Sequence, residues 1–293
     1  MRAAVLDDRG VLAVTGADAK SFLHNVVTCA VEGAEPGAAR YGALLTPQGK
    51  ILADFLLLAT ADGALIDVAR DVLPELKKRL ALYRLRAKVA IDDLSDTLAV
   101  AVLWDGGDAP PASAASFADP RLPALGVRAF LPKDGADAAL AAMGAAIVPA
   151  AAWHAHRIAL GIPEGGRDFV FGDAFPHEAD LDQLAGVDFR KGCYIGQEVV
   201  SRMEHRGTAR SRVVPVTLDG PAPPPGTEVA AGGRPLGRMG SSAEDRGLAL
   251  LRLDRAAEAE AAGQPITAGA ASLAVALPAW ARFTLPAPEK TAS

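Results

Sequence analysis

The 293-residue sequence contains only two cysteines, Cys29 and Cys193, and neither belongs to a CxxC pair. This scarcity excludes a disulfide framework and disfavours a structural zinc site. The sequence also lacks an unbroken run of about 18 apolar residues, the length needed for a membrane-spanning helix. The N-terminal segment reaches Asp7 and Asp8 before an apolar run as long as that of a signal peptide develops. We therefore expect a cytoplasmic protein with reduced thiols and no membrane association.

An excess of basic charge is absent too. The net charge is -5 and the pI is near 5.6, which disfavours attraction to nucleic acid or to an anionic membrane. Four catalytic motifs are missing: GxGxxG after a strand, the Walker phosphate loop, HExxH and GxSxG. The sequence therefore does not indicate a nucleotide-binding enzyme, a zinc hydrolase or a serine hydrolase. Half of the residues are hydrophobic, and the length favours two or three globular domains.

The apolar pattern predicts a mixture of helices and strands. Residues 11–28 predict a strand that ends at Gly16 and a helix with Asp18 as its candidate N-cap. A Pro/Gly turn at 46–49 predicts a β-hairpin. Residues 71–88 predict an amphipathic helix whose basic side chains either bind an anionic ligand or form an ordinary solvated face.

Later segments are shorter. Residues 105–115 predict a surface loop, and residues 153–163 predict a helix that stops at Gly161 or Pro163. From residue 213 onward, short apolar segments separated by glycine and proline predict a small antiparallel barrel or sandwich.

The clearest chemical content lies in residues 191–198, KGCYIGQE. We interpret them as a glycine-bounded loop that leads into a helix starting at Gln197. Cys193 would then lie just before a helix N-terminus, with Arg190 and Lys191 close by. Backbone amides and cationic side chains both stabilise a thiolate. We therefore predict that Cys193 is a nucleophile or a transient ligand for a metal or for sulfur.

The same residues permit a structural interpretation. Cys193 would then be a small buried apolar residue, and Gly192 and Gly196 would serve turn geometry. Glu198 and Arg202 would form an ordinary i,i+4 pair. Spacing alone does not separate the two interpretations.

Three further positions have candidate roles. Glu178, in the acidic run FPHEADLD, could accept two hydrogen bonds side by side from the amino-pyrimidine edge of a pterin, or could simply belong to a solvated turn. His154 and His156 lie two residues apart, a spacing that diverges on a helix, so we predict no metal pair there. Cys29 has no clustered polar partner and is predicted to be a core residue.

The run KGCYIGQEVVSRMEHRG closely resembles the signature of the YgfZ family of folate-binding iron-sulfur cluster assembly proteins, whose hallmark is KGCYxGQE. The resemblance extends to GADAKSFLHNVVT, LLTPQGKILADFLL, LRAKVAI, RIALGIP and FPHEADLD, and more loosely to GRPLGRMGSS. It covers nearly the whole chain and is weakest over residues 105–151. The family is similar in fold to the aminomethyltransferase of glycine cleavage, the T-protein.

The resemblance implies an α+β fold with three domains in a ring around a folate-sized channel. Residues 1–44 together with 152–207 are expected to form a discontinuous folate-binding domain. Residues 45–151 are expected to form a second α+β domain, and residues 208–293 a C-terminal antiparallel β-barrel.

The resemblance also implies roles for individual residues. Cys193 and Lys191 occupy signature positions and are expected to carry the chemistry, with no resident metal. Gly192, Gly196 and Glu198 complete the signature. Polar side chains in and around it are expected to contact the cofactor, tetrahydrofolate or another reduced folate. These are Glu178, which matches the folate-contacting glutamate of the T-protein, Tyr194, Gln197, Arg202 and Arg206.

The function implied is that of a folate-binding accessory protein for iron-sulfur cluster assembly or repair. Its expected partners are iron-sulfur enzymes, including radical enzymes that modify tRNA, or assembly proteins, without direct contact to nucleic acid. Two cysteines cannot supply the four thiolates of a typical cluster, which leaves open a bridged or transient species on Cys193. The alternative is a folate-dependent one-carbon transferase of the aminomethyltransferase or demethylase type. Ala53 and Asp54 stand where the T-protein has adjacent aspartates, which counts against aminomethyl transfer.

Overall fold

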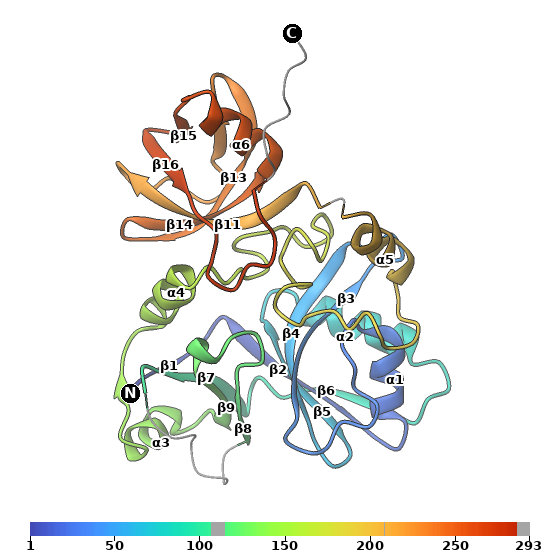
Figure 1. Cartoon of the computed structure of the whole chain (residues 1–293). Helices are drawn as coiled ribbons and strands as arrows, with labels where there is room; N and C mark the ends of the chain where they lie inside the picture. The colour runs from blue at the N-terminus through green and yellow to red at the C-terminus, as the bar shows by residue number, and fades with distance from the viewer. Residues whose placement is uncertain (107–114, 208, 286–293) are drawn as a thin grey trace. The chain divides into compact units, whose positions relative to one another are not determined.

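The computed structural model describes residues 1–106, 115–207 and 209–285 (Figure 1). The predicted surface loop at 105–115 lies mostly outside these residues. The chain forms two compact units, Met1–Trp153 with Leu184–Ser201 and His154–Gln183 with Arg202–Ser293. No helix in the described ranges is long and apolar enough to cross a membrane.

The first unit contains two five-stranded sheets. One has the strand order β3-β4-β5-β2-β6 and is antiparallel throughout. Helices α1 (Ala19–Val26) and α2 (Leu73–Tyr83) pack on it, and Leu12, Leu23, Phe55 and Leu76 belong to their shared core. The strands are β2 (Arg9–Thr15), β3 (Ala39–Leu45), β4 (Ile51–Ala59), β5 (Gly63–Ala69) and β6 (Ala90–Asp93).

The other sheet of this unit has the order β10-β1-β7-β9-β8. Only its pair β1–β10 is parallel. Helix α3 (Ala136–Ala142) packs against it through Ala136 and Leu140. The strands are β1 (Arg2–Val5), β7 (Leu98–Trp104), β8 (Ala115–Ala118), β9 (Val127–Pro132) and β10 (Ala146–Ile147), with a 3₁₀ turn at Pro123–Leu125.

A chain of buried ion pairs joins the two sheets. Asp67 on β5 accepts hydrogen bonds from Arg9 on β2, at 2.6 Å, and from Arg128 on β9. Arg128 also pairs with Asp119 at 3.3 Å, and Arg121 pairs with Asp119 at 2.7 Å. The side chains of these five residues are at most 6% exposed. Buried charges of this kind are tolerated only when each has its partner, so the network fixes how the two sheets meet.

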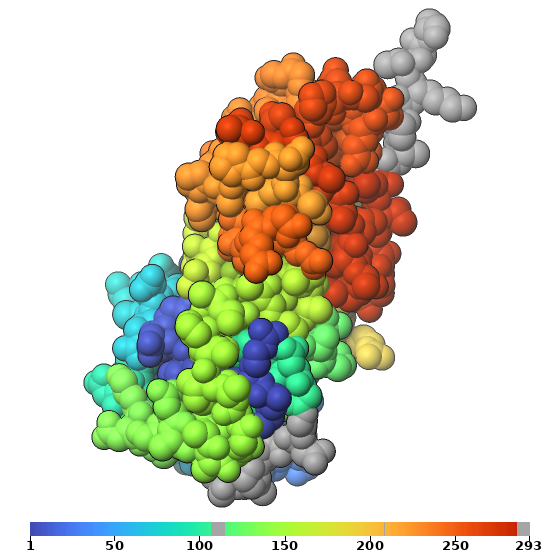
Figure 2. Space-filling model, turned by 90° about the vertical axis from the view of Figure 1, so that its left-hand side faces the viewer, coloured from blue at the N-terminus to red at the C-terminus, as the bar shows by residue number. Residues whose placement is uncertain are grey.

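The second unit contains a closed six-stranded barrel with the strand order β11-β14-β13-β12-β15-β16. In Figure 2 its residues, coloured orange to red, gather into one compact body. Helix α6 (Leu253–Ala261) contributes Leu253 and Ala256 to the barrel core. The strands are β11 (Ser211–Asp219), β12 (Glu228–Ala231), β13 (Arg234–Ala243), β14 (Arg246–Arg252), β15 (Ile266–Ala268) and β16 (Ala271–Val275).

Two helices, α4 (Ala150–Ala159) and α5 (Gln197–Arg206), each run across a boundary between the units. The helix predicted at 153–163 is α4, and Gly161 follows it with φ +75°, the conformation that suits a glycine after a helix. Between α4 and α5 the chain has neither helices nor regular strands. This long segment carries most of the predicted site residues.

Several sequence predictions are confirmed here. The α+β fold, the opening strand and helix, the hairpin at 46–49 and the C-terminal antiparallel barrel are all present. The predicted N-cap position is confirmed, because Asp18 is the N-cap residue of α1. Its side chain makes no capping bond, however, and instead accepts the backbone N–H of Lys88 at 2.8 Å. The predicted domain boundary at 44/45 falls inside β3. The three-part division of the chain itself stays a prediction.

Candidate functional site

The signature loop ends where helix α5 begins, at Gln197, as the sequence predicts. Cys193 in this loop is exposed, so its interpretation as a buried apolar residue is wrong. The next residue, Tyr194, is buried, and its carbonyl accepts the backbone N–H of Gln197 at 3.3 Å. The loop therefore turns its tyrosine inward and leaves the sulfur accessible.

Lys191 fastens this loop to helix α1. Its Nζ donates to the carbonyl oxygens of Val27, at 2.6 Å, and Cys29, at 3.0 Å, and also to that of His24. The carbonyls of His24 and Val27 lie in the last turn and at the C-cap of α1, where a positive charge is favoured, and that of Cys29 lies just beyond. Desolvation by burial lowers the pKa of Lys191 to about 8. The geometry thus gives Lys191 a holding role; its predicted catalytic role stays a prediction.

The two signature glycines differ. Gly196 has φ +79°, and a Cβ there would lie 2.5 Å from the Thr46 carbonyl oxygen and 3.0 Å from Gly49 Cα. Glycine is therefore required for the loop to pack on the β3–β4 turn. A Cβ on Gly192 would meet nothing within 4 Å, and nothing in the structure explains this glycine. The close approach at Gly196 is to the protein's own turn rather than to a ligand.

Tyr194 holds a buried polar group at the centre of the loop. Its side chain is 6% exposed, and its hydroxyl makes no hydrogen bond with any residue that the structure describes. Burial, together with the Asp188 carboxylate, raises the pKa of Tyr194 to about 12. The phenol is therefore neutral at physiological pH. A buried hydroxyl without a partner costs free energy, which makes it a candidate donor to a bound ligand.

Glu178 is half-buried in a tight turn rather than in a solvated acidic loop. Its Oε2 accepts the backbone N–H of Phe175 at 2.9 Å, and its carbonyl accepts the N–H of Val213 on β11 at 2.9 Å. The hydrogen bond from Phe175 thus orients the carboxylate.

A cluster of ion pairs lies next to Glu178 in the sequence. Nε2 of His177 lies 3.0 Å from Oε2 of Glu204, and with Asp182 these groups offer three metal-ligand atoms within 4.8 Å of one another. Arg212, however, binds both oxygens of Asp182, at 2.9 and 2.8 Å, and Asp180 at 2.9 Å. We therefore interpret the group as a salt-bridged anchor for this segment. Sequence reasoning missed Arg212, because a lone arginine on a strand belongs to no motif.

The remaining predicted contacts lie on α5. Gln197 is half-buried at its first turn, while Arg202 and Arg206 are exposed and four residues apart, on one face of the helix. Lys191, Cys193, Tyr194 and Gln197 belong to the first compact unit. Glu178, Arg202 and Arg206 belong to the second.

Asp54, the aspartate retained from the T-protein pair, is 3% exposed on β4. Its Oδ2 accepts the hydroxyl of Tyr41 at 3.1 Å. The guanidinium of Arg121 lies 5.4 Å from the centre of the Tyr41 ring. The carboxylate therefore adjoins the buried charges that join the two sheets.

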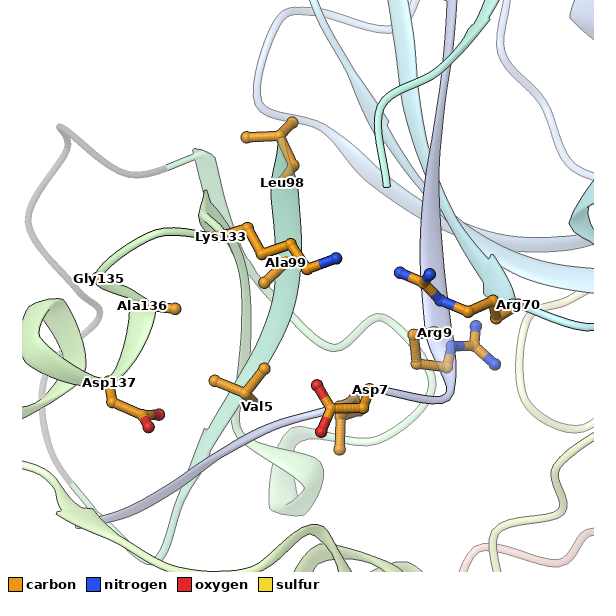
Figure 3. A pocket seen from close by; sticks show the side chains of 11 residues that line it. Val5, Asp7, Arg9, Arg70, Leu98, Ala99, Lys133, Gly135, Ala136 and Asp137 are labelled. Carbon is orange, nitrogen blue, oxygen red and sulfur yellow. The ribbon is translucent and has the colours of Figure 1, made fainter. Parts of the chain in front are cut away.

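A separate cavity of about 300 Å³ in the first unit contains none of the predicted site residues. Figure 3 shows Lys133 and Arg70 extending toward one another across it. Both donate to the carbonyl oxygen of Ser95 at 3.3 Å, and the carboxylates of Asp7 and Asp137 also line the cavity. Because charges of both signs line it and its cations already share an acceptor, we assign no ligand to it.

Comparisons with known protein families match two parts of the chain. Residues 6–109 match the GCVT N-terminal domain, and residues 210–283 match the C-terminal β-barrel domain of CAF17. The aminomethyltransferase T of the glycine cleavage system from Bartonella henselae superposes with a TM-score of 0.73, covering 94% of this chain and 84% of that one. Its sequence identity is 17%, so it shows a shared fold.

Curated relatives carry a more specific name. The human mitochondrial iron-sulfur cluster assembly factor IBA57 is 34% identical over 279 residues, which cover 84% of this chain and 76% of that protein. The homologue from Mycosarcoma maydis is 36% identical over 233 residues, covering 74% of this chain and 57% of that protein. In the Neurospora crassa homologue the matched region covers 54% of the length, so the chain spans little more than half of these two fungal proteins.

Proposed function

Because the chain belongs to the family of the iron-sulfur cluster assembly factor IBA57, we propose that it assists cluster assembly or repair. In this proposal Cys193 is the one ligand that the chain itself provides to a cluster that is being transferred between proteins. The observation that carries the proposal is the exposed sulfur on a loop held by Lys191 and Gly196. A second protein can reach such a thiol. One thiolate is too few for a cluster, so a client or a carrier protein supplies the other ligands.

We include a reduced folate, tetrahydrofolate, in the proposal. Each unit by itself holds groups of suitable chemistry: the buried hydroxyl of Tyr194 in the first, and the half-buried carboxylate of Glu178 with the exposed cations of α5 in the second. Glu178 would accept hydrogen bonds from the pterin edge, Tyr194 would donate one, and Arg202 and Arg206 would bind the anionic tail. Gln197 at the start of α5 is a further contact. When bound, the folate supplies a carrier for one-carbon units.

The proposed clients are cluster enzymes, among them radical enzymes that modify tRNA. The net charge of -5 favours action through such proteins over direct binding to tRNA. We propose a cytoplasmic location and membership of the YgfZ branch of these proteins. The curated names place the human and fungal relatives in mitochondria, which is a statement about those proteins.

Two measurements test the proposal. In cells that lack their own copy, the Cys193→Ala chain should fail to restore a cluster-dependent enzyme, while the matched Cys29→Ala chain restores it. Full restoration by Cys193→Ala would remove the cysteine from the mechanism. Calorimetry with tetrahydrofolate should give a binding isotherm that Glu178→Gln weakens, and the absence of binding heat would remove the folate.

The buried Asp54 favours a second candidate, a folate-dependent one-carbon transferase. It lies within the match to the GCVT N-terminal domain and accepts a hydrogen bond from Tyr41. Incubation with tetrahydrofolate and an aminomethyl or N-methyl donor tests it directly. Turnover that Asp54→Asn abolishes would establish the transferase, and the lack of turnover in the wild type would reject it.

A further inference from the structure

Two leucines at the end of helix α2 are exposed in a way that the fold does not require. Leu82 is 59% exposed, and Leu85, two residues beyond the end of the helix, is 87% exposed. Leu85 also has φ +47°, a left-handed conformation that a leucine adopts rarely. Neither burial nor backbone preference therefore accounts for a leucine at this position. Exposed apolar side chains held in strained backbone are typical of contact sites.

A cavity of about 360 Å³ lies beside Leu85, between α1 and residues 83–87. Phe22 and Val26 line it from α1, and Tyr83 and Leu85 line it from the other side. Its volume is within the range of roughly 300–1,000 Å³ that is usual for ligand pockets. The cavity therefore has room for apolar side chains of another molecule.

The charge around this cavity is opposite to that of the whole chain. Residues 77–88 contain six basic residues and no acidic one, whereas the net charge of the chain is -5. Arg84 and Arg86 line the cavity and are exposed. Asp18 also lines it, but its carboxylate is held by the backbone N–H of Lys88 at 2.8 Å. An acidic partner is therefore complementary to this surface.

The cavity shares helix α1 with the signature loop. Asn25 and Val26 line the cavity, and the carbonyls of His24 and Val27 accept hydrogen bonds from Lys191, two residues before Cys193. A protein bound over the cavity thus contacts the same helix to which the thiol-bearing loop is fastened.

We propose that the surface formed by Phe22, Val26, Tyr83, Arg84, Leu85 and Arg86 is a docking surface for an acidic protein segment with an apolar anchor. The partner is the protein that shares a cluster with Cys193, so this identification rests on the proposed function. A cavity of about 360 Å³ between α1 and residues 83–87 suits a single protein side chain better than a lipid surface, which would need a broad apolar face.

The test uses the full chain and a fluorescent peptide of about 12 residues, rich in Asp and Glu, with one Phe-Leu pair as its anchor. Fluorescence anisotropy should show binding that Leu85→Ser and Arg84→Glu/Arg86→Glu each weaken by about tenfold or more. Raising salt from about 50 to about 300 mM should weaken it further. The matched control Leu277→Ser, at another exposed leucine, should bind as the wild type does.

One further variant and three further measurements can overturn the proposal. Leu85→Gly should raise the melting temperature, because it relieves the left-handed strain, yet lose peptide binding. A lowered melting temperature would show that Leu85 packs within the fold and would overturn the proposal. Three other results would overturn it as well. The first is that a peptide with Ser in place of Phe-Leu binds as tightly as the original peptide. The others are that the chain prefers phosphatidylserine vesicles to the peptide, or that sedimentation shows a dimer that depends on Leu85. None of these measurements involves Cys193 or a cluster. A negative result would therefore reject the docking surface and leave the proposed function untouched.

Discussion

The two cysteines lie in opposite environments, and their reactivity follows from that. Cys193 is exposed, whereas Cys29 is 2% exposed and burial raises its pKa to about 11. Near pH 7.5, iodoacetamide should therefore modify Cys193 in the folded protein and Cys29 more slowly by about a hundredfold or more. Mass spectrometry of the alkylated chain measures both rates. Cys193→Ser should leave no fast site, and a fast site in that variant would contradict the assigned environments.

Gly196 and Gly192 provide a matched pair of signature positions. Gly196→Ala adds a Cβ in left-handed backbone and against the Thr46 carbonyl, so it should lower the free energy of unfolding by about 2–4 kcal/mol. Gly192→Ala should change it by less than about 0.5 kcal/mol, because its Cβ meets nothing. Urea denaturation of the three proteins measures the difference. Equal effects at both positions would argue against the packing of the loop on the β3–β4 turn.

The ammonium of Lys191 makes stability depend on pH. Its pKa is about 8 in the folded chain and about 10.4 in an unfolded one. Between these two pKa values the unfolded chain binds more protons at Lys191 than the folded chain does, so the free energy of unfolding rises with pH. In the other direction, this contribution is lost as pH falls through about 8. The free energy of unfolding of wild type minus that of Lys191→Met should therefore increase from pH 7 to pH 10. A constant difference across that range would place the amine in solvent.

At the scale of the elements, the two sheets of the first unit depend on one carboxylate. Asp67 on β5 neutralises Arg9 on β2 and Arg128 on β9, and all three are buried. Asp67→Asn should lower the free energy of unfolding by about 3–5 kcal/mol, because the two buried guanidinium groups lose the carboxylate that they share. The control Asp105→Asn breaks an ion pair with Arg2 whose side chains are 44–45% exposed, and should cost at most about 1 kcal/mol. A similar cost for both substitutions, measured by urea denaturation, would contradict the buried network.

Local patterns in the sequence predicted individual elements better than their contacts. The Pro/Gly turn at 46–49 gave the hairpin, and helical spacing gave α2 because apolar periodicity reports which face is buried. The hydrogen bonds from Lys191 to α1 join residues more than 160 positions apart, so no local pattern contains them. Asp18 occupies the N-cap position that the sequence predicted, but its carboxylate binds the backbone N–H of Lys88, a contact that no local pattern contains.

At the scale of the whole molecule, the long motif carried more information than composition. KGCYIGQE and its flanking resemblances predicted the T-protein-like fold, and they favoured a barrel where the apolar spacing after residue 213 allowed a barrel or a sandwich. Exposure of Cys193 and burial of Tyr194 could not be predicted, because adjacent loop residues have no periodicity to assign a face. The anchoring of Glu178 through Phe175 and Val213 likewise depends on β11, far along the chain.

The central claim is that the chain provides one ligand to an iron-sulfur cluster, the sulfur of Cys193. Anaerobic reconstitution with ferric iron, sulfide and glutathione, which supplies the missing thiolates, tests it through visible circular dichroism and bound iron per chain. We predict cluster signals for the wild type and for Cys29→Ala, and their loss in Cys193→Ala. The same signals and iron content in Cys193→Ala would contradict the account.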